Sequence, residues 1–376
     1  MKDRHLTSFT GMSLEDIQKL CKSIGEPVYR AKQILLWIYN KGATSFEQMR
    51  NLPGRLREEL EKKYLLFQTE VDTVTKTIDG TEKLAIRLFD GNIIESVLLR
   101  NRRKVTACVS TQVGCAMACS FCASGQLGLE RNLDTGEIIE QILHIKNHLH
   151  QNESLTNIVF MGIGEPLANY DNVIKSLKIM NADWGLGISM RRITVSTVGI
   201  VTGIRRLARE RLKINLAISL HASDDSTRSG IIPSNKKNSI RNILATVREY
   251  FMATHRDISF EYTLIEGINS SLQDATALVR LLKGIRCIIN ILPLNPIEEC
   301  ELRPPDRKTV EMFCNILERN GMVVTLRKKK GDDVDAACGQ LRLQRYKDGK
   351  RHKTRKTGGG KPLRKQNKTA SITMLE

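Results

Sequence analysis

The stretch Cys115-Ala-Met-Ala-Cys119-Ser-Phe-Cys122 brings three cysteines together directly after a strand-like run. Thiolates at this spacing can wrap one loop around a metal centre, and they suit both iron–sulfur clusters and zinc. A structural zinc site usually takes a fourth ligand from a second Cys or His pair, which is missing nearby. Three thiolates instead leave one iron of a 4Fe–4S cluster open, where S-adenosylmethionine (SAM) can bind through its amino and carboxylate groups. The spacing therefore favours a cluster on Cys115, Cys119 and Cys122 over zinc or metal-free buried cysteines.

Strand-like and helix-like runs alternate from residue 105 to residue 341. The strand-like runs are Val105–Ser110, Asn157–Met161, Arg192–Ser196, Ile214–Ser219, Ile258–Leu264, Cys287–Leu292 and Val323–Leu326. Amphipathic helical segments lie between them, at 135–150, 170–181, 201–210, 238–254, 271–284 and 307–320. This alternation predicts an α/β fold with a parallel sheet, and six or seven units indicate a partial (β/α)6 barrel spanning 105–341. Ligands should then bind at the carboxyl ends of the strands.

Three further segments flank the predicted barrel. Residues 1–70 read as helices, with a capping pair at Ser13 and Asp16, a third helix starting near Ser45, and a break at Pro53-Gly54. Residues 71–104 show short alternating runs between Asp-Gly turns, which predict a small β extension. Residues 342–376 form a basic tail with few apolar residues, which we expect to be disordered on its own.

The net charge and the cysteine content indicate the kind of partner, the cellular compartment and the role of the cysteines. The chain has 376 residues and a formal net charge of +18, with a pI near 9.6. Such a charge favours a polyanionic partner, nucleic acid ahead of an anionic membrane, although a solvated basic face would also produce it. The N-terminus is polar and no apolar run is long enough for a membrane span, so we expect a cytoplasmic protein with no membrane contact. In a reducing cytosol, nine cysteines indicate metal ligands or catalysts rather than a disulfide framework.

The residues around the cluster motif resemble the signature of the RlmN/Cfr family of radical SAM RNA methyltransferases. The resemblance begins with Cys108-Val-Ser-Thr-Gln-Val-Gly-Cys115. Further stretches match in family order, at Glu26–Ile34, Gly91–Val97, Phe160–Leu167, Ser196–Gly199, Ser219–His221 and Asp335–Leu341. Val113, the Glu-Pro-Leu after Gly164, and the segment Asn169–Asn172 make the chain more similar to the RlmN branch than to Cfr.

The resemblance implies a radical SAM barrel that consumes two molecules of SAM per turnover. The implied product is 2-methyladenosine in the peptidyl-transferase centre of 23S rRNA, and in many members also in tRNA next to the anticodon. In the family scheme Cys338 receives a methyl group, whose carbon then joins the adenine in a transient protein–RNA adduct. Cys108 releases the methylated RNA by forming a disulfide with Cys338, which requires their Cα atoms to come within ~7 Å. Glu95 matches the residue that the family scheme presumes to accept the proton from the adenine ring, and Cys108 is the alternative acceptor of this proton.

Each of these residues also has a plainer interpretation. Alone, Cys338 would more often be a small buried hydrophobe, and Cys108 a core cysteine or a spare cluster ligand. Glu95 would be a surface strand residue, unless burial beside its apolar neighbours raised its basicity. The resemblance also implies RNA binding by the helical accessory domain, where a solvated face is the alternative for the basic side chains Arg30, Lys32, Arg50, Arg55 and Arg57.

The resemblance places SAM on residues that mostly end strand-like runs. Glycine at such a position lets the backbone approach a ligand closely, although a lone Gly-x-Gly-Glu or a lone histidine is a weak signal. The implied SAM residues are Gly164, Glu165, Ser196, Ser219, Leu220 (through its backbone), His221 and Asn295.

The resemblance also implies an external one-electron donor such as flavodoxin, and a monomeric enzyme. Two other functions stay open. One is a Cfr-type enzyme that methylates carbon 8 of the same adenosine. The other is a non-enzymatic RNA-binding assembly factor with a structural metal.

Overall fold

The computed structural model describes residues 7–101, 104–126, 128–297, 300–327, 339–341 and 344–345. The three cysteines of the cluster motif, Cys108, Glu95 and all of the expected SAM residues fall within these ranges. Cys338 lies outside the described residues, as does the basic tail from residue 346 onward.

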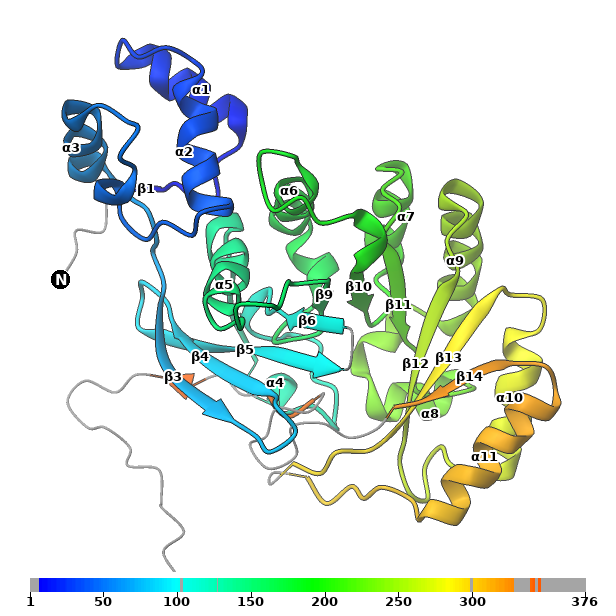
Figure 1. The fold of residues 1–376 in the computed structure, drawn as a ribbon. Helices are drawn as coiled ribbons and strands as arrows, with labels where there is room; N and C mark the ends of the chain where they lie inside the picture. Colours follow the sequence, from blue (N-terminus) through cyan, green and yellow to red (C-terminus); the bar gives the residue numbers. More distant parts are fainter. Residues whose placement is uncertain are drawn as a thin grey trace, which may run out of the picture. The chain divides into compact units, whose positions relative to one another are not determined.

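One sheet forms the centre of the described chain (Figure 1). Each parallel strand is hydrogen-bonded to the next one in sequence, so their carboxyl ends meet at one edge. This arrangement confirms the predicted α/β fold with a partial barrel. The parallel strands are β6 (Lys104–Cys108), β9 (Asn157–Phe160), β10 (Ile193–Thr197), β11 (Asn215–Ser219), β12 (Ile258–Leu264), β13 (Cys287–Pro293) and β14 (Val323–Leu326).

Helices connect these strands and cover the outer side of the sheet (Figure 1). Aliphatic side chains of the strands and helices fill the layer between them, in keeping with the low aromatic content. The predicted helical segments form α5 (Thr135–Asn147), α6 (Tyr170–Asn181), α7 (Val201–Arg209), α9 (Ile240–Thr254), α10 (Leu272–Leu282) and α11 (Arg307–Arg319). Two further helices, α4 (Ala123–Gln126) and α8 (Asp225–Ile231), were not predicted, because four and seven residues are too few to show a helical period.

The predicted β extension continues the sheet of the barrel. Its strands β3 (Glu70–Lys76), β4 (Glu82–Arg87) and β5 (Asn92–Asn101) pair antiparallel with one another. β5 also pairs antiparallel with β6, the first barrel strand. A short strand β15 (Gln344–Arg345) pairs with β5 where the described chain ends.

The N-terminal region contains three helices, α1 (Leu14–Ser23), α2 (Arg30–Tyr39) and α3 (Gly54–Lys63). The predicted capping pair is present, since Ser13 Oγ accepts from the Asp16 N–H and the Asp16 carboxylate accepts from the Ser13 N–H. The helix expected near Ser45 is only a 3-10 turn, η1 (Phe46–Gln48). Backbone before a proline disfavours the helical region, which explains why no longer helix forms ahead of Pro53.

A single buried carboxylate links this helical region to the barrel. Glu140 of α5 is fully buried, and its Oε1 accepts from Ser8 Oγ at 2.9 Å and Thr10 Oγ1 at 2.5 Å. Its Oε2 accepts from the Thr69 N–H at 2.8 Å and Thr69 Oγ1 at 2.6 Å, and the Gln68 N–H reaches both oxygens. These donors lie at the two ends of the helical region, so one side chain fixes both of its connections.

Candidate active site

The cluster motif forms a loop between β7 (Gln112–Gly114) and α4 (Ala123–Gln126). The Cys115 N–H donates to the Gly128 carbonyl at 2.8 Å, just before β8 (Leu129–Asn132), which pairs with β7. The Ser120 N–H donates to the carbonyl of Ile231 in α8 at 3.0 Å, and the Ala123 N–H donates to the Gly339 carbonyl at 2.8 Å. Three separate parts of the chain therefore hold this loop in one shape.

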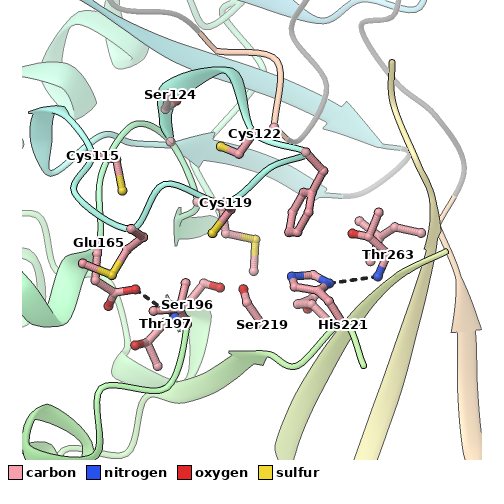
Figure 2. A pocket seen from close by; sticks show the side chains of 18 of the residues that line it. Cys115, Cys119, Cys122, Ser124, Glu165, Ser196, Thr197, Ser219, His221 and Thr263 are labelled. Atoms are coloured by element: carbon pink, nitrogen blue, oxygen red, sulfur yellow. Dashed lines mark hydrogen bonds between the residues drawn. The ribbon is translucent and has the colours of Figure 1, made fainter. Parts of the chain in front are cut away.

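The loop forms one wall of a pocket at the carboxyl ends of the strands (Figure 2). The pocket has about 990 Å³ of space, part of which is open to solvent. Its lining includes all of the predicted cluster and SAM residues except Leu220. These lining residues are Cys115, Cys119, Cys122, Gly164, Glu165, Ser196, Ser219, His221 and Asn295.

The three thiols suit a cluster better than a single ion. Among the described residues, no three His, Cys, Asp or Glu side chains are arranged to ligate one metal ion. A 4Fe–4S cluster places each thiolate on a different iron, so its ligands surround a volume instead of converging on a point. Burial raises the pKa of Cys115 to about 12 and also raises that of Cys119, so both need a cation to become thiolates. The donor set therefore fits a 4Fe–4S cluster, which three thiolates would leave with one iron unligated by the protein.

Gly164 and Glu165 form the loop after β9. Gly164 has φ +105, and a Cβ there would meet Gln112 Cβ at 2.6 Å, so only glycine fits. The Glu165 side chain is buried and already engaged, since its Oε2 accepts from the Val198 N–H at 2.8 Å (Figure 2) and its Oε1 from the Leu167 N–H at 3.0 Å. Burial raises the pKa of Glu165 to about 7. Glu165 thus braces the pocket wall and joins the ends of β9 and β10.

His221 adopts the left-handed conformation, φ +56, just after β11. Its Nδ1 accepts from the Thr263 N–H at 2.9 Å (Figure 2). Its ring centroid lies 4.9 Å from that of Phe121, in an edge-to-face arrangement. Burial, helped by the charge of Arg228, lowers the pKa of His221 to about 3. His221 is therefore a neutral ring that packs against the cluster loop, with Nε2 as its remaining N–H donor.

Leu220 lies outside the pocket lining. Its N–H donates to the Glu261 carbonyl at 3.0 Å, and its carbonyl accepts from Arg228 Nε at 2.9 Å. Both backbone groups are thus engaged within the protein, although the carbonyl has a second lone pair, so the backbone contact with SAM that the resemblance implies stays a prediction.

Two buried charged residues near the pocket were not predicted. Arg228 lies in α8, and Glu261 lies in β12 beside Ser219 in the register. Glu261 lines the pocket, its Oε1 accepts from Asn290 Nδ2 at 2.8 Å, and its Oε2 lies 3.6 Å from Arg327 Nη1. In sequence both residues look like ordinary surface charges, and the signal for Glu261 is its place inside an otherwise apolar strand-like run.

Cys108 and Glu95 come together on one face of the sheet, outside the pocket lining. Cys108 pairs with Val97, and Glu95 precedes Val97 by two residues, so the three side chains point to the same side. Ser96 points to the other side, where its Oγ donates to Gln141 Oε1 of α5 at 2.6 Å. Cys108 and Glu95 are 6% and 1% exposed, so both side chains are buried.

The distance expected between Cys108 and Cys338 falls outside the described residues. The chain immediately after Cys338 is described, and Gly339 lines the pocket with φ +87. Gln340 Nε2 donates to the Pro296 carbonyl at 3.1 Å, and Ser124 Oγ donates to the Leu341 carbonyl at 2.7 Å. Residues 339–341 are therefore anchored to the cluster loop and to the loop after β13.

Comparisons with known proteins agree with this arrangement. A sequence model described as the ribosomal RNA large subunit methyltransferase N-terminal domain matches residues 7–66, and one for the radical SAM superfamily matches residues 109–279. A protein of Rhodopirellula baltica named "Probable dual-specificity RNA methyltransferase RlmN" is 44% identical over 333 residues, covering 89% of this chain and 90% of that protein. A protein of Protochlamydia amoebophila named "Probable dual-specificity RNA methyltransferase RlmN 2" is 48% identical, covering 88% of this chain and 93% of that protein.

A solved structure shows the same fold. The crystal structure of a radical SAM methyltransferase from Sphaerobacter thermophilus is 40% identical and has a TM-score of 0.88, covering 89% of this chain and 99% of that one. Radical SAM enzymes use a 4Fe–4S cluster and SAM, for which the pocket supplies three thiols and a set of polar strand ends. The chain belongs to the RlmN family of radical SAM methyltransferases.

Proposed function

We propose that this enzyme makes 2-methyladenosine in the peptidyl-transferase centre of 23S rRNA, and also in tRNA next to the anticodon. The names of its relatives, which specify dual-specificity RNA methyltransferases, support RNA as the substrate. The observation that carries the proposal is that Gly339, the neighbour of Cys338 in the chain, lines the same pocket as the three cluster cysteines. Carbon 2 of adenine is not nucleophilic, so a polar methyl transfer fails there and radical chemistry is needed.

The pocket residues divide into cluster ligands and SAM contacts. Cys115, Cys119 and Cys122 would hold the cluster. The Gly164–Glu165 backbone, Ser196, Ser219, His221 and Asn295 would hold SAM. When bound, the cluster and SAM supply one-electron chemistry and the transferred methyl group, with two molecules of SAM used per turnover. Phe121 and His221 pack against each other in the pocket lining and would present an apolar surface to the bound groups.

Two cysteines would carry the methyl carbon onto the base and then release it. Cys338 carries the carbon on its sulfur until the carbon is bonded to adenine. Glu95 accepts the ring proton, and the Cys108 thiolate attacks the Cys338 sulfur. That attack forms a disulfide and breaks the carbon–sulfur bond, whose electron pair stays on the carbon. The carbon then takes up a proton to become the methyl group, and the methylated RNA is released. The shared face of Cys108 and Glu95 supports roles in consecutive steps.

The N-terminal helices would bind RNA through part of their basic surface. Lys32, Arg50 and Arg55 are exposed and free to contact phosphates. Arg30 and Arg57 instead bind within the protein, since Arg30 Nη1 donates to the Asn51 carbonyl and Arg57 Nη1 to the Glu47 carbonyl. Exposed charges position RNA without reading its bases, and the target adenosine must then leave its stack to reach the pocket.

The enzyme would work as a monomer in the cytoplasm, with an external one-electron donor such as flavodoxin. Among the described residues, no helix is both long and apolar enough to cross a membrane. A mechanism with free thiols requires a reducing compartment, which supports the cytoplasm.

Nucleoside analysis of rRNA and tRNA from a deletion strain tests the proposal. The strain should lack 2-methyladenosine in both RNAs, and the wild-type gene should restore it. A gene carrying Cys115→Ala should not restore it. An adenosine methylated at carbon 8 would instead establish a Cfr-type enzyme, and unchanged nucleosides would favour the non-enzymatic assembly factor.

A further inference from the structure

Arg228 is a completely buried cation in α8. Its guanidinium Nε donates to the Leu220 carbonyl at 2.9 Å, and its Nη2 donates to the carbonyls of Ser219 at 2.9 Å and Val198 at 2.5 Å. Its Nη1 donates to Asn235 Oδ1 at 2.7 Å. Arg228 therefore holds together the carboxyl ends of β10 and β11, which carry Ser196 and Ser219 into the pocket.

All of these acceptors are neutral, so the charge of Arg228 is not balanced by them. Among the described residues, no carboxylate hydrogen-bonds directly to Arg228. The exposed Asp225 is linked to it through Asn235, whose Nδ2 donates to Asp225 Oδ1 at 2.9 Å. Burial lowers the pKa of Arg228 to about 10, which still leaves it charged at neutral pH. A buried charge is costly unless an opposite charge lies near it. An anion close to Arg228 would therefore stabilise its buried charge.

The cluster loop lies directly against the helix that carries Arg228. The Ser120 N–H donates to the carbonyl of Ile231, three residues after Arg228, and Cys119 packs in one apolar cluster with Ile231 and Ile232. Arg228 therefore lies about one helical turn before the residue that holds the cluster loop, on a helix whose end packs against Cys119.

We propose that Arg228 is a positioning residue that provides the buried counter-charge for the iron–sulfur cluster while it fixes the strand ends around SAM. This inference rests on the proposed ligation of the cluster by Cys115, Cys119 and Cys122. A 4Fe–4S cluster on three thiolates is anionic, and it becomes more so when an external reductant adds one electron. A nearby buried cation stabilises the reduced state more than the oxidised state, which raises the midpoint potential of the cluster.

Redox titration of the full-length protein with a reconstituted cluster tests this role without RNA. Arg228→Gln keeps several hydrogen-bonding atoms but removes the charge, and Arg228→Lys keeps the charge but loses the planar fork. Electron paramagnetic resonance during dithionite titration measures the midpoint potential of the cluster. This potential should be lower in Arg228→Gln than in the wild type, and close to the wild-type value in Arg228→Lys. Arg206→Gln is the matched control, since Arg206 is an exposed arginine that pairs with Asp171.

Thermal unfolding with and without the cluster supplies a second measurement. If Arg228 balances the cluster, loading the cluster should raise the melting temperature of the wild type by more than that of Arg228→Gln. An unchanged midpoint potential in Arg228→Gln, at full iron content, would overturn the proposal. The proposal would also be overturned if Arg228→Gln lowered the melting temperature by the same amount with and without the cluster, or if this variant folded in neither state. Either result would show that Arg228 only holds the strand ends together. Loss of iron from wild-type protein, or a Cys115→Ala variant that keeps its cluster, would instead contradict the proposed ligation.

Discussion

Lys83 Nζ lies 3.0 Å from Glu95 Oε1, in an ion pair whose side chains are only 15% and 2% exposed. The two residues belong to neighbouring strands, on the sheet face that also carries Cys108. The sequence suggested a carboxylate made more basic by apolar neighbours. The structure instead places the Lys83 ammonium beside Glu95, so the candidate proton acceptor is part of a buried ion pair within the sheet.

Lys83→Met should destabilise the protein, because the buried Glu95 carboxylate loses this cation. Removing one partner of a buried pair costs about 3 kcal/mol or more, which urea unfolding should detect. Lys76→Met removes a more exposed lysine on the same sheet, one that pairs with Glu82, and should cost less than about 1 kcal/mol. Equal losses in the two variants would show that the Lys83 pair contributes no more than a surface pair.

Cys108→Ala should trap RNA on the protein, because no thiolate remains to attack the Cys338 sulfur. Incubation with SAM, a reductant and an rRNA fragment should give a covalent adduct that survives a denaturing gel. Cys21→Ala is the matched control, since Cys21 is a buried cysteine of α1 far from the proposed chemistry in sequence. Methylated product from Cys108→Ala with no adduct would rule out the release step proposed here.

Replacing any cluster cysteine with alanine should remove iron from the protein. Anaerobically purified Cys115→Ala, Cys119→Ala and Cys122→Ala should lack the brown colour of a cluster, because two thiolates hold it too weakly. Cys314→Ala, a change at a buried cysteine of α11, should keep the iron content of the wild type. Zinc in place of iron, in wild-type protein purified without air, would contradict the cluster assignment.

Glu140→Ala should loosen the connection between the helical region and the barrel. The change strands buried donors at Thr10 and Thr69, and each stranded group costs about 1–3 kcal/mol. Urea unfolding should therefore show a large decrease in the free energy of unfolding of Glu140→Ala. The decrease should be smaller for Glu140→Gln, which retains one acceptor oxygen. Glu59→Ala, at an exposed i,i+4 pair, is the control and should change little. A loss no larger than that of the control would mean that Glu140 does not hold the connection.

Acidification should weaken the same connection through His144. Burial, with a smaller effect of His148, lowers the pKa of His144 to about 4, from an ordinary value of 6.5. A depressed histidine pKa stabilises the fold above pH 6.5, and this stabilisation is lost as the pH falls from 6.5 toward 4. Glu140 acts in the opposite direction, because burial raises its pKa to about 7, so the contribution of His144 must be isolated by a variant.

Urea unfolding of the wild type and of His144→Gln, at pH 7 and pH 5, makes that comparison. The wild type should lose more free energy of unfolding between the two pH values than the variant does. Parallel losses would show that His144 titrates normally in the folded protein.

The sequence predicted the barrel and the cluster loop well, for physical reasons. Parallel strands buried on both faces carry continuous apolar runs, such as Leu216–Ile218 in β11, and these runs are recognisable without a partner strand. The three cysteines lie in one short loop, so their grouping at the pocket follows from their spacing in sequence. Most of the expected SAM residues line the pocket, because strand ends in this topology meet at one edge.

Features that depend on tertiary contacts were not predictable. Arg228 and Glu261 have the composition of surface residues, and their burial depends on elements distant in sequence. The common face of Cys108 and Glu95 follows from the register between β5 and β6, which no local pattern specifies. The ion pair between Lys83 and Glu95 requires a further register, between β4 and β5.

β6 is the strand where the two halves of the sheet meet, antiparallel to β5 on one side and parallel to β9 on the other. A fragment that begins at residue 105 would expose the β5-facing edge of this strand, and an exposed edge invites aggregation. The extension and the barrel are thus distinct in sequence but inseparable as folding units. A shift in the register of β6 would therefore disturb the strand pairing of both halves at once.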